Sequence, residues 1–391
     1  MGGPPCQAYS LVGRSRNSGI KTYKPKKDHR HFLYQEYCRV LTEYSPSVFV
    51  MENVKGMLSS SVEGLAIFET VMNDLESAGE GYRLFALSGT ERDLDRPAPR
   101  SFVLKTEDFG VPQSRHRVII VGIKRSIAEK IPEEFLPFLP KKKLKSTVRD
   151  VLSGMPKLRS GLSKNDDVLA WYGALVAAIE SVKSCLDNYK GSNKSKFLSE
   201  LGRVETSVLN KNKKRASKAR APYPKSISED LKVFLTDERI KALSSNETRG
   251  HMDTDLARYL FASCFATAEG RSPKADEFPK DLAPNHANWG TGKFSDRFRV
   301  QRWDAPATTV TSHISKDGHY YIHPDATQCR SLTVREAARL QTFPDNYHFL
   351  GNRTQQFVQV GNAVPPYLAK QIAEALLPVF DYIDRLQPKL E

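Results

Sequence analysis

The chain has 391 residues, of which 39% are hydrophobic, so it is long enough for two domains with cores of their own. Lys and Arg number 59 against 45 Asp and Glu, and the resulting net charge of +14 favours a polyanionic partner. No apolar run approaches the roughly 18 residues of a membrane span, and residues 1–5 begin no signal peptide. The composition therefore predicts a cytoplasmic protein without membrane contact.

The cysteines favour the same reducing compartment. Their number is odd, and they form no C-x-x-C pair and no metal-ligand cluster with His, which argues against a disulfide framework and a structural zinc site. They are Cys6, Cys38, Cys185, Cys264 and Cys329.

Helical and strand patterns alternate in the first 125 residues, which predicts an α/β sheet. The predicted elements are a helix at 32–44, a strand at 48–51, a helix at 65–75, and strands at 83–87 and 117–123. Pro46 ends the first helix and Gly79 the second. The run at 48–51 is continuously apolar, as in a parallel strand that is covered on both faces.

The pattern changes between residues 126 and 300. Apolar side chains from Val168 to Leu186 recur at helical spacing and predict a helix. The polar run 210–218 looks like a mobile loop whose charges all have one sign. It is either a solvated linker or a contact for phosphates, and the sequence leaves both open.

Helix signals return near the C-terminus. Thr333 and Glu336 form a capping box at the start of a short helix. Pro366 opens a terminal helix. Its predicted buried face consists of Leu368, Ile372, Leu376 and Val379.

Three segments carry side chains suited to chemistry. Cys6 follows two glycines and two prolines, which make a stiff loop that aims its thiol; the alternative is a buried structural cysteine. Glu52 follows the apolar run 48–51, at the strand end where open sheets bind ligands, and is a candidate acid or else an N-cap. In a strand, Gln113, Arg115 and Arg117 would share one face, as phosphate ligands or as an edge-strand charge ladder.

In this order, these segments resemble the DNA cytosine-5 methyltransferase family. Gly3–Gln7 matches its catalytic loop, Glu52–Val54 its carboxylate motif and Gln113–Arg117 its Gln-x-Arg-x-Arg motif. Residues 330–345 and 359–366 look like its last two motifs. The resemblance implies an α/β, Rossmann-like methyltransferase sheet, incomplete at its start, and a mixed α+β target-recognition domain. The implied division is 1–125 catalytic, 126–300 recognition and 301–391 catalytic.

The resemblance also implies a mechanism. A cytosine is flipped out of double-stranded DNA, and Cys6 attacks its C6 while Glu52 holds or protonates N3. Arg117 would reach O2, and Arg115 would support the loop or a phosphate. C5 then takes the methyl group of S-adenosylmethionine, and loss of the C5 proton expels the thiolate. Further implied contacts are Gln7, Ser10, Arg14 and Gln113 for the substrate, and Asn362 and Val364 for the cofactor.

One part of the family pattern is absent. The family begins with a strand and a Phe-x-Gly-x-Gly loop that holds the cofactor, and this sequence contains neither. The chain is expected to be a subunit whose companion polypeptide supplies that half, a truncated reading frame, or an inactive remnant. On the first two alternatives, the isolated chain would bind the cofactor poorly.

Two other functions stay open beside a DNA methyltransferase of a restriction-modification system. A DNA-recognition subunit without catalysis would keep the basic surface, although the intact Cys6, Glu52, Arg115 and Arg117 argue against it. A tRNA methyltransferase of the same family would carry Cys-Phe-Thr where this chain has residues 264–266, Cys-Phe-Ala.

Overall fold

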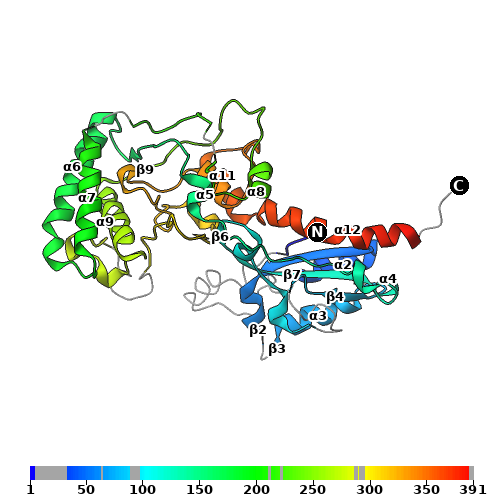
Figure 1. Cartoon of the computed structure of the whole chain (residues 1–391). Helices are drawn as coiled ribbons and strands as arrows, with labels where there is room; N and C mark the ends of the chain where they lie inside the picture. Colours follow the sequence, from blue (N-terminus) through cyan, green and yellow to red (C-terminus); the bar gives the residue numbers. More distant parts are fainter. Residues whose placement is uncertain are drawn as a thin grey trace. The chain divides into compact units, whose positions relative to one another are not determined.

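The computed structural model of the chain, drawn in Figure 1, describes residues 1–4, 33–62, 65–88, 97–209, 213–220, 223–285, 289 and 296–386. The contacts divide the chain into two units. The first comprises residues 1–109, 115–143 and 368–391, and the second comprises 110–114 and 144–367. The predicted boundaries at 125 and 300 concern a different division, into catalytic and recognition parts, and stay a prediction.

The first unit is built on a sheet in which β7 is the central strand. The strands of this sheet are β1 (Val48–Val54), β4 (Tyr82–Phe85), β5 (Val103–Lys105) and β7 (His116–Lys124), and a separate small pair is β2 (Ser61–Val62) with β3 (Leu65–Ala66). The α-helices are α2 (Tyr34–Tyr44), α3 (Ile67–Ser77), α4 (Arg125–Ala128) and α12 (Pro366–Leu386). Short 3-10 helices lie at Lys55–Ser59, Pro99–Phe102, Thr106–Phe109 (η5) and Glu133–Phe135 (η6).

The strands of this sheet pair differently from the prediction. β1 runs antiparallel to β7 over its whole length, from Val48 opposite Ile123 to Val54 opposite Arg117, and β4 and β5 are also antiparallel to β7. The prediction that residues 48–51 pair in parallel is therefore wrong for the pairing with β7. A single parallel bridge does join Met51 of β1 to Gly2. A continuous apolar run reports burial of both strand faces, and it does not encode strand direction.

The predicted helices are present with shifted limits. Leu65 lies in β3 and not in the helix that follows, whose buried side chains include Phe68, Met72 and Leu75. Gly79 ends that region with a φ of 57°, as predicted for a helix stop. In α2, Leu41 is buried but Val40 and Tyr44 are exposed, so the predicted apolar face of this helix is only partly covered.

The second unit contains a helical part with its own core. Its α-helices are α5 (Val148–Leu152), α6 (Val168–Ser184), α7 (Lys194–Val208), α8 (Glu229–Leu235), α9 (Asp253–Glu269), α10 (Val334–Leu340) and α11 (Arg353–Asn362). Its strands are β6 (Gln113–Ser114), β8 (Gly161–Leu162), β9 (Gly250–His251) and β10 (Ala307–Thr308). Its 3-10 helices are Leu186–Asn188, Ala275–Glu277, Lys280–Leu282, Ser312–Ser315 (η10) and Ala326–Gln328.

Large apolar side chains of α6, α7 and α9 form this core. Trp171, Phe197 and Phe261 are fully buried within it. The helical stripe predicted from Val168 to Leu186 is confirmed as α6, although Val168 itself is exposed. Among the helices that the structure describes, none is both long and apolar enough to cross a membrane.

The predicted capping box at the start of α10 is confirmed and has a second function. Thr333 Oγ1 accepts from the Glu336 amide at 3.1 Å, and Thr333 N donates to Glu336 Oε2 at 2.8 Å. Glu336 also forms a fully buried bidentate ion pair with Arg330, at 2.6 and 2.7 Å. Burial alone would raise the pKa of Glu336, but the charge and hydrogen bonds of Arg330 outweigh it and lower this pKa to about 2.

Glu336→Gln should destabilise the protein by about 3–5 kcal/mol, because it leaves the Arg330 guanidinium buried without its counter-charge. The lowered pKa of Glu336 stabilises the fold above its ordinary value of 4.5, and this contribution is lost as the pH falls towards 2. Urea unfolding at several pH values measures both effects. Glu229→Gln, at an exposed pair with Lys232, is the control and should change stability by less than about 0.5 kcal/mol. A cost below 1 kcal/mol for Glu336→Gln would contradict this assignment.

Candidate active site

Two of the predicted catalytic side chains meet in the first unit. Glu52 lies in β1 and Arg117 in β7, and the antiparallel register places Val54 opposite Arg117. Arg117 Nε lies 2.9 Å from Glu52 Oε1, and both side chains are largely buried. Arg117 Nη1 also donates to the His116 carbonyl at 2.9 Å. The guanidinium thus lies against the carboxylate, and Glu52 belongs to β1 itself, opposite Ile119 of β7, and does not follow the strand end as predicted.

The chain that leads to Cys6 passes beside this pair. Gly2 N donates to Val50 O and Glu52 N donates to Gly2 O, both at 2.9 Å, so Gly2 extends the sheet next to β1. A Cβ atom on Gly3 would lie 3.1 Å from Glu52 Oε2, and Asn53 Nδ2 donates to Pro4 O at 3.4 Å. Four predicted site residues, namely Cys6, Gln7, Ser10 and Arg14, lie outside the described residues.

The prediction that Gln113, Arg115 and Arg117 lie on one uninterrupted strand is wrong. The strand is broken at Arg115, so that β6 ends at Ser114 and β7 starts at His116. The backbone N and O of Arg115 bond to Thr106 at 3.1 and 3.2 Å, which explains the break. The Arg115 side chain is buried, and the neighbouring His116 contacts Glu107 at 2.8 Å.

Gln113 belongs to the second unit, and its side chain is fully buried there. Its Oε1 accepts from Val310 N at 2.7 Å, and its Nε2 donates to Gln341 Oε1 at 2.7 Å and to Leu340 O at 3.2 Å. These bonds correct the predicted contact with substrate, because they commit both ends of the amide to other protein groups. Gln113 is therefore a structural link in the described conformation.

The two residues predicted to contact the cofactor lie at the end of α11, in the second unit. Asn362 is the last residue of the helix and is exposed, whereas Val364 is half-buried. The preceding Gly361 touches the backbone before η10, since a Cβ there would lie 2.2 Å from both Ser312 N and Thr311 C. Only glycine permits this contact. The next residue, Asn362, lies at the surface.

The predicted loop at 210–218 is extended and paired on both sides over the residues that the structure describes. Lys214 O accepts from Arg159 N at 3.0 Å, and Arg215 O accepts from Thr248 N at 2.9 Å. Its side chains alternate. Lys213 Nζ is buried and donates to Thr327 O at 2.7 Å, with its pKa lowered by burial, and Arg215 Nη1 donates to Asp166 at 3.0 Å. The exposed cations of the segment 213–220 are Lys214, Lys218 and Arg220.

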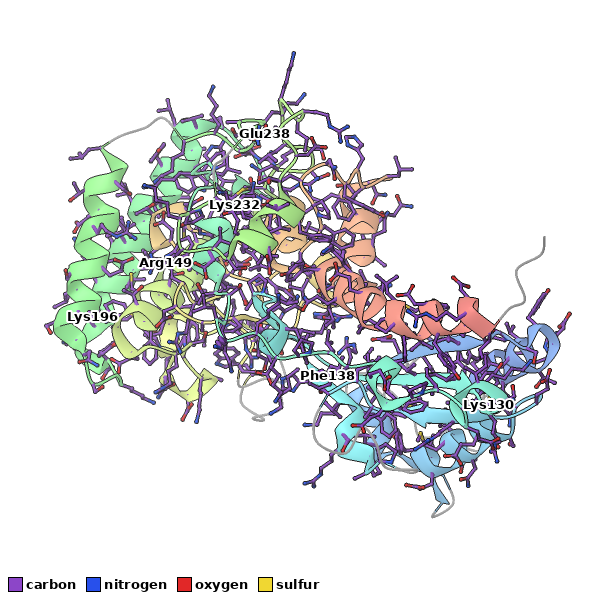
Figure 2. The ribbon with its side chains drawn as sticks, turned by 45° about the vertical axis from the view of Figure 1, so that its right-hand side comes forward. Lys130, Phe138, Arg149, Lys196, Lys232 and Glu238 are labelled. Carbon is purple, nitrogen blue, oxygen red and sulfur yellow. The ribbon has the colours of Figure 1, made fainter. Side chains whose placement is uncertain are left out.

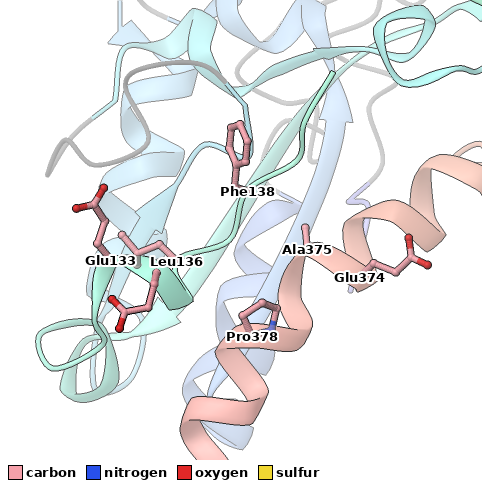
Figure 3. A pocket seen from close by; sticks show the side chains of 7 residues that line it. Glu133, Leu136, Phe138, Glu374, Ala375 and Pro378 are labelled. Carbon is pink, nitrogen blue, oxygen red and sulfur yellow. The ribbon is translucent and has the colours of Figure 1, made fainter. Parts of the chain in front are cut away.

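A cavity of about 570 Å³ lies in the first unit, away from these residues in the sequence (Figure 3). Phe138 and Leu136 line it from one segment, and Ala375 and Pro378 from α12. The carboxylates at its rim are Glu133, Glu134 and Glu374. None of the predicted site residues lines it.

Sequence reasoning gave Gln341 no role, although it lies within a motif that resembled the family. Its importance is tertiary, since Gln341 is 228 residues from its partner Gln113. No local pattern could reveal that pair. Exposed and less exposed side chains alternate at Lys213, Lys214 and Arg215, as they do in a strand. All three side chains are cationic, so the sequence shows no alternation of polarity that would predict this.

Comparisons with known proteins show the family of the chain. The model of the family described as C-5 cytosine-specific DNA methylase matches residues 1–377. The chain is 36% identical over 385 residues to the type II methyltransferase M.Bpa9945I of Bacillus paralicheniformis, covering 97% of this chain and 70% of that relative. It is 29% identical over 391 residues to the type II methyltransferase M.AgeI of Thalassovita gelatinovora, covering 96% and 82%.

A solved structure supports the fold. It is described as a prophage-encoded DNA modification methyltransferase from E. coli, and it matches with a TM-score of 0.50 and 20% identity. The match covers 97% of this chain and 78% of that one. The expected methyltransferase fold class is thereby confirmed.

Proposed function

The chain belongs to the family of C-5 cytosine-specific DNA methylases, and we propose that it methylates C5 of cytosine at a specific site in duplex DNA, with S-adenosylmethionine as the methyl donor. The observation that carries this proposal is the ion pair of Glu52 with Arg117 beside the chain leading to Cys6. Because the relatives are type II methyltransferases, we place the reaction in a restriction-modification system.

Cys6 is the proposed nucleophile. Cys6 follows Pro4 by two positions in the sequence, and two residues span at most about 7 Å. Its thiolate attacks C6 of the flipped cytosine and forms a C–S bond, which makes C5 nucleophilic. After methyl transfer, loss of the C5 proton restores the double bond and expels the thiolate.

Glu52 and Arg117 stabilise the charge that this attack creates. Glu52 holds or protonates N3, which draws electrons from C6, and Arg117 reaches O2. The largely buried position of both side chains strengthens these interactions over those in water. Arg115 is proposed to support the catalytic loop or a phosphate, and Gln7, Ser10 and Arg14 to contact DNA.

Asn362 and Val364 fit the methionine end of the cofactor. The exposed Asn362 amide can both donate to a carboxylate and accept from an ammonium group, and Val364 offers a half-buried apolar surface beside it. S-adenosylmethionine supplies the activated methyl group when bound. These two residues hold and orient it.

The segment 213–220 is a proposed phosphate contact. Lys214, Lys218 and Arg220 are exposed at every second or fourth residue of a segment that pairs through single bridges at Lys214 and Ala216. Two residues of a strand span about 6.6 Å, which is close to twice the 3.4 Å spacing of phosphates along one DNA strand's axis. Lys213 and Arg215 point inward and hold the segment in place.

We also propose a companion polypeptide that binds the first unit. β1 lies at the end of the described sheet, with Gly2 pairing on its outer side, and such an edge can accept a further strand. In the same unit α12 exposes Leu377 and Phe380, and Phe138, labelled in Figure 2, is 43% exposed. Apolar side chains of this size favour a partner surface.

With the companion and S-adenosylmethionine supplied, duplex DNA with 5-fluorocytosine at its target site should trap the protein covalently, because fluorine cannot leave C5 as a proton does. Cys6→Ser should abolish the adduct, and Glu52→Gln should slow its formation by about 10²-fold or more. Cys38→Ser is the matched control and should trap like the unmodified protein. An adduct that survives Cys6→Ser would overturn the mechanism, and methyl transfer to tRNA in preference to DNA would overturn the substrate.

Replacing Lys214, Lys218 and Arg220 together by Ala should reduce the slope of log K against log salt concentration for duplex DNA by roughly 2.7, or about 0.9 for each lost phosphate contact. Fluorescence anisotropy over a salt series measures the slope. The control replaces Lys183, Lys194 and Lys196, exposed on α6 and α7, of which Lys196 is labelled in Figure 2. An equal loss of slope in both triple variants would argue against a specific role for the segment 213–220.

Calorimetry of the purified chain alone should show weak S-adenosylmethionine binding, and addition of the product of a neighbouring reading frame should strengthen it. The apolar surface of α12 and the edge of β1 would be covered in that complex. Tight binding by the chain alone would refute the companion and would leave the methyltransferase assignment intact.

A further inference from the structure

We infer that Gln341 is a positioning residue for the cofactor end of the active site, through a relay of two buried amides that ends at the backbone around Asn362. The inference rests on the proposed role of Asn362 in cofactor binding. Every residue of the relay belongs to the second unit.

The relay consists of consecutive hydrogen bonds. Val310 N donates to Gln113 Oε1 at 2.7 Å, and Gln113 Nε2 donates to Gln341 Oε1 at 2.7 Å. Gln341 Nε2 then donates to Val360 O at 2.7 Å and to Ala363 O at 3.1 Å. Both glutamine side chains are completely buried.

The direction of this relay is fixed by its ends. A backbone N–H can only donate and a backbone carbonyl can only accept, so neither amide can be turned round without placing like groups against each other. A buried amide that lost a partner would keep the cost of desolvation without the compensating hydrogen bond. The two side chains therefore behave as one rigid connection.

The turn after α10 holds Gln341 in place. Thr342 has a φ of 63°, a left-handed conformation that is costly for a β-branched residue. Its hydroxyl donates to the Gln341 carbonyl at 2.6 Å and accepts from Tyr367 N at 3.1 Å. Such strain persists only where neighbouring contacts maintain it, and here they determine the path of the chain at Gln341.

The relay acts on Asn362 from both sides. Val360 precedes Asn362 by two residues and Ala363 follows it, and a single Gln341 nitrogen binds the carbonyls of both. Gly361, between them, lies against the backbone at Thr311 and Ser312. The backbone at Asn362 is thus fixed while its side chain stays exposed to a ligand.

The test compares Gln113→Met, Gln341→Met and the double variant, which keep side-chain volume but remove the amide bonds. Amide hydrogen exchange of peptides covering residues 357–367 should rise in all three. The dissociation constant for S-adenosylhomocysteine should rise at least about tenfold, while DNA affinity stays within about twofold. Because the two amides form one connection, the double variant should bind S-adenosylhomocysteine no more weakly than the more strongly affected single variant.

Gln328→Met is the control, since Gln328 is also buried and its amide oxygen accepts from Leu158 N at 2.8 Å and from Arg330 at 2.8 and 3.1 Å, and none of its described bonds reaches α11. Gln328→Met should change neither the hydrogen exchange of residues 357–367 nor the dissociation constant for S-adenosylhomocysteine. Unchanged exchange at 357–367 in Gln341→Met, or additive effects in the double variant, would overturn the relay. If Gln341→Met does not fold, Gln113→Met tests the same connection from its other end. Unchanged cofactor affinity in Asn362→Ala would instead refute the proposed role of Asn362, which the exchange data do not depend on.

Discussion

The antiparallel register of β1 and β7 is the constraint on which the proposed chemistry depends. A shift of one residue would turn the side chains of β1 to the opposite face and separate Glu52 from Arg117. Phe49 lies opposite Gly122 in this register, and a Cβ on Gly122 would come within 2.1 Å of the Phe49 ring. The absence of a side chain at Gly122 therefore makes room for Phe49 and secures the alignment that brings Glu52, the proposed catalytic carboxylate, to Arg117.

The second unit uses buried polar groups where the first uses an apolar sheet. The Arg330–Glu336 pair and the side chains of Gln113 and Gln341 are completely buried, and the ion pair joins residues six apart whereas the two glutamines are 228 apart. Satisfied polar networks specify one geometry more strictly than apolar contacts do, because misplacement leaves an unpaired group in a low dielectric. Strict geometry is what a surface must have if it orients a cofactor and supports a domain that recognises DNA.

The excess positive charge is likewise divided between two purposes. Within the segment 213–220, Lys213 and Arg215 are bound to protein oxygens and stabilise the fold, whereas Lys214 and Lys218 are exposed, as is Arg220, which also donates to Glu238 O at 3.3 Å. A net charge of +14 thus overstates the number of cations available to a polyanion. The alternation of a paired extended backbone decides which of them can meet phosphates.

The sequence by itself determined the family, the order of its motifs and most local elements, including the capping box at Thr333 and the helix that begins at Pro366. These depend on short-range patterns, which a linear sequence records directly. The tertiary structure alone decided the antiparallel pairing of β1, the break at Arg115 and the burial of Gln113 against Gln341. Each of these results from hydrogen bonds outside a single helix or strand, between residues nine apart for Thr106 and Arg115 and 228 apart for Gln113 and Gln341, and no local periodicity specifies which donor meets which acceptor.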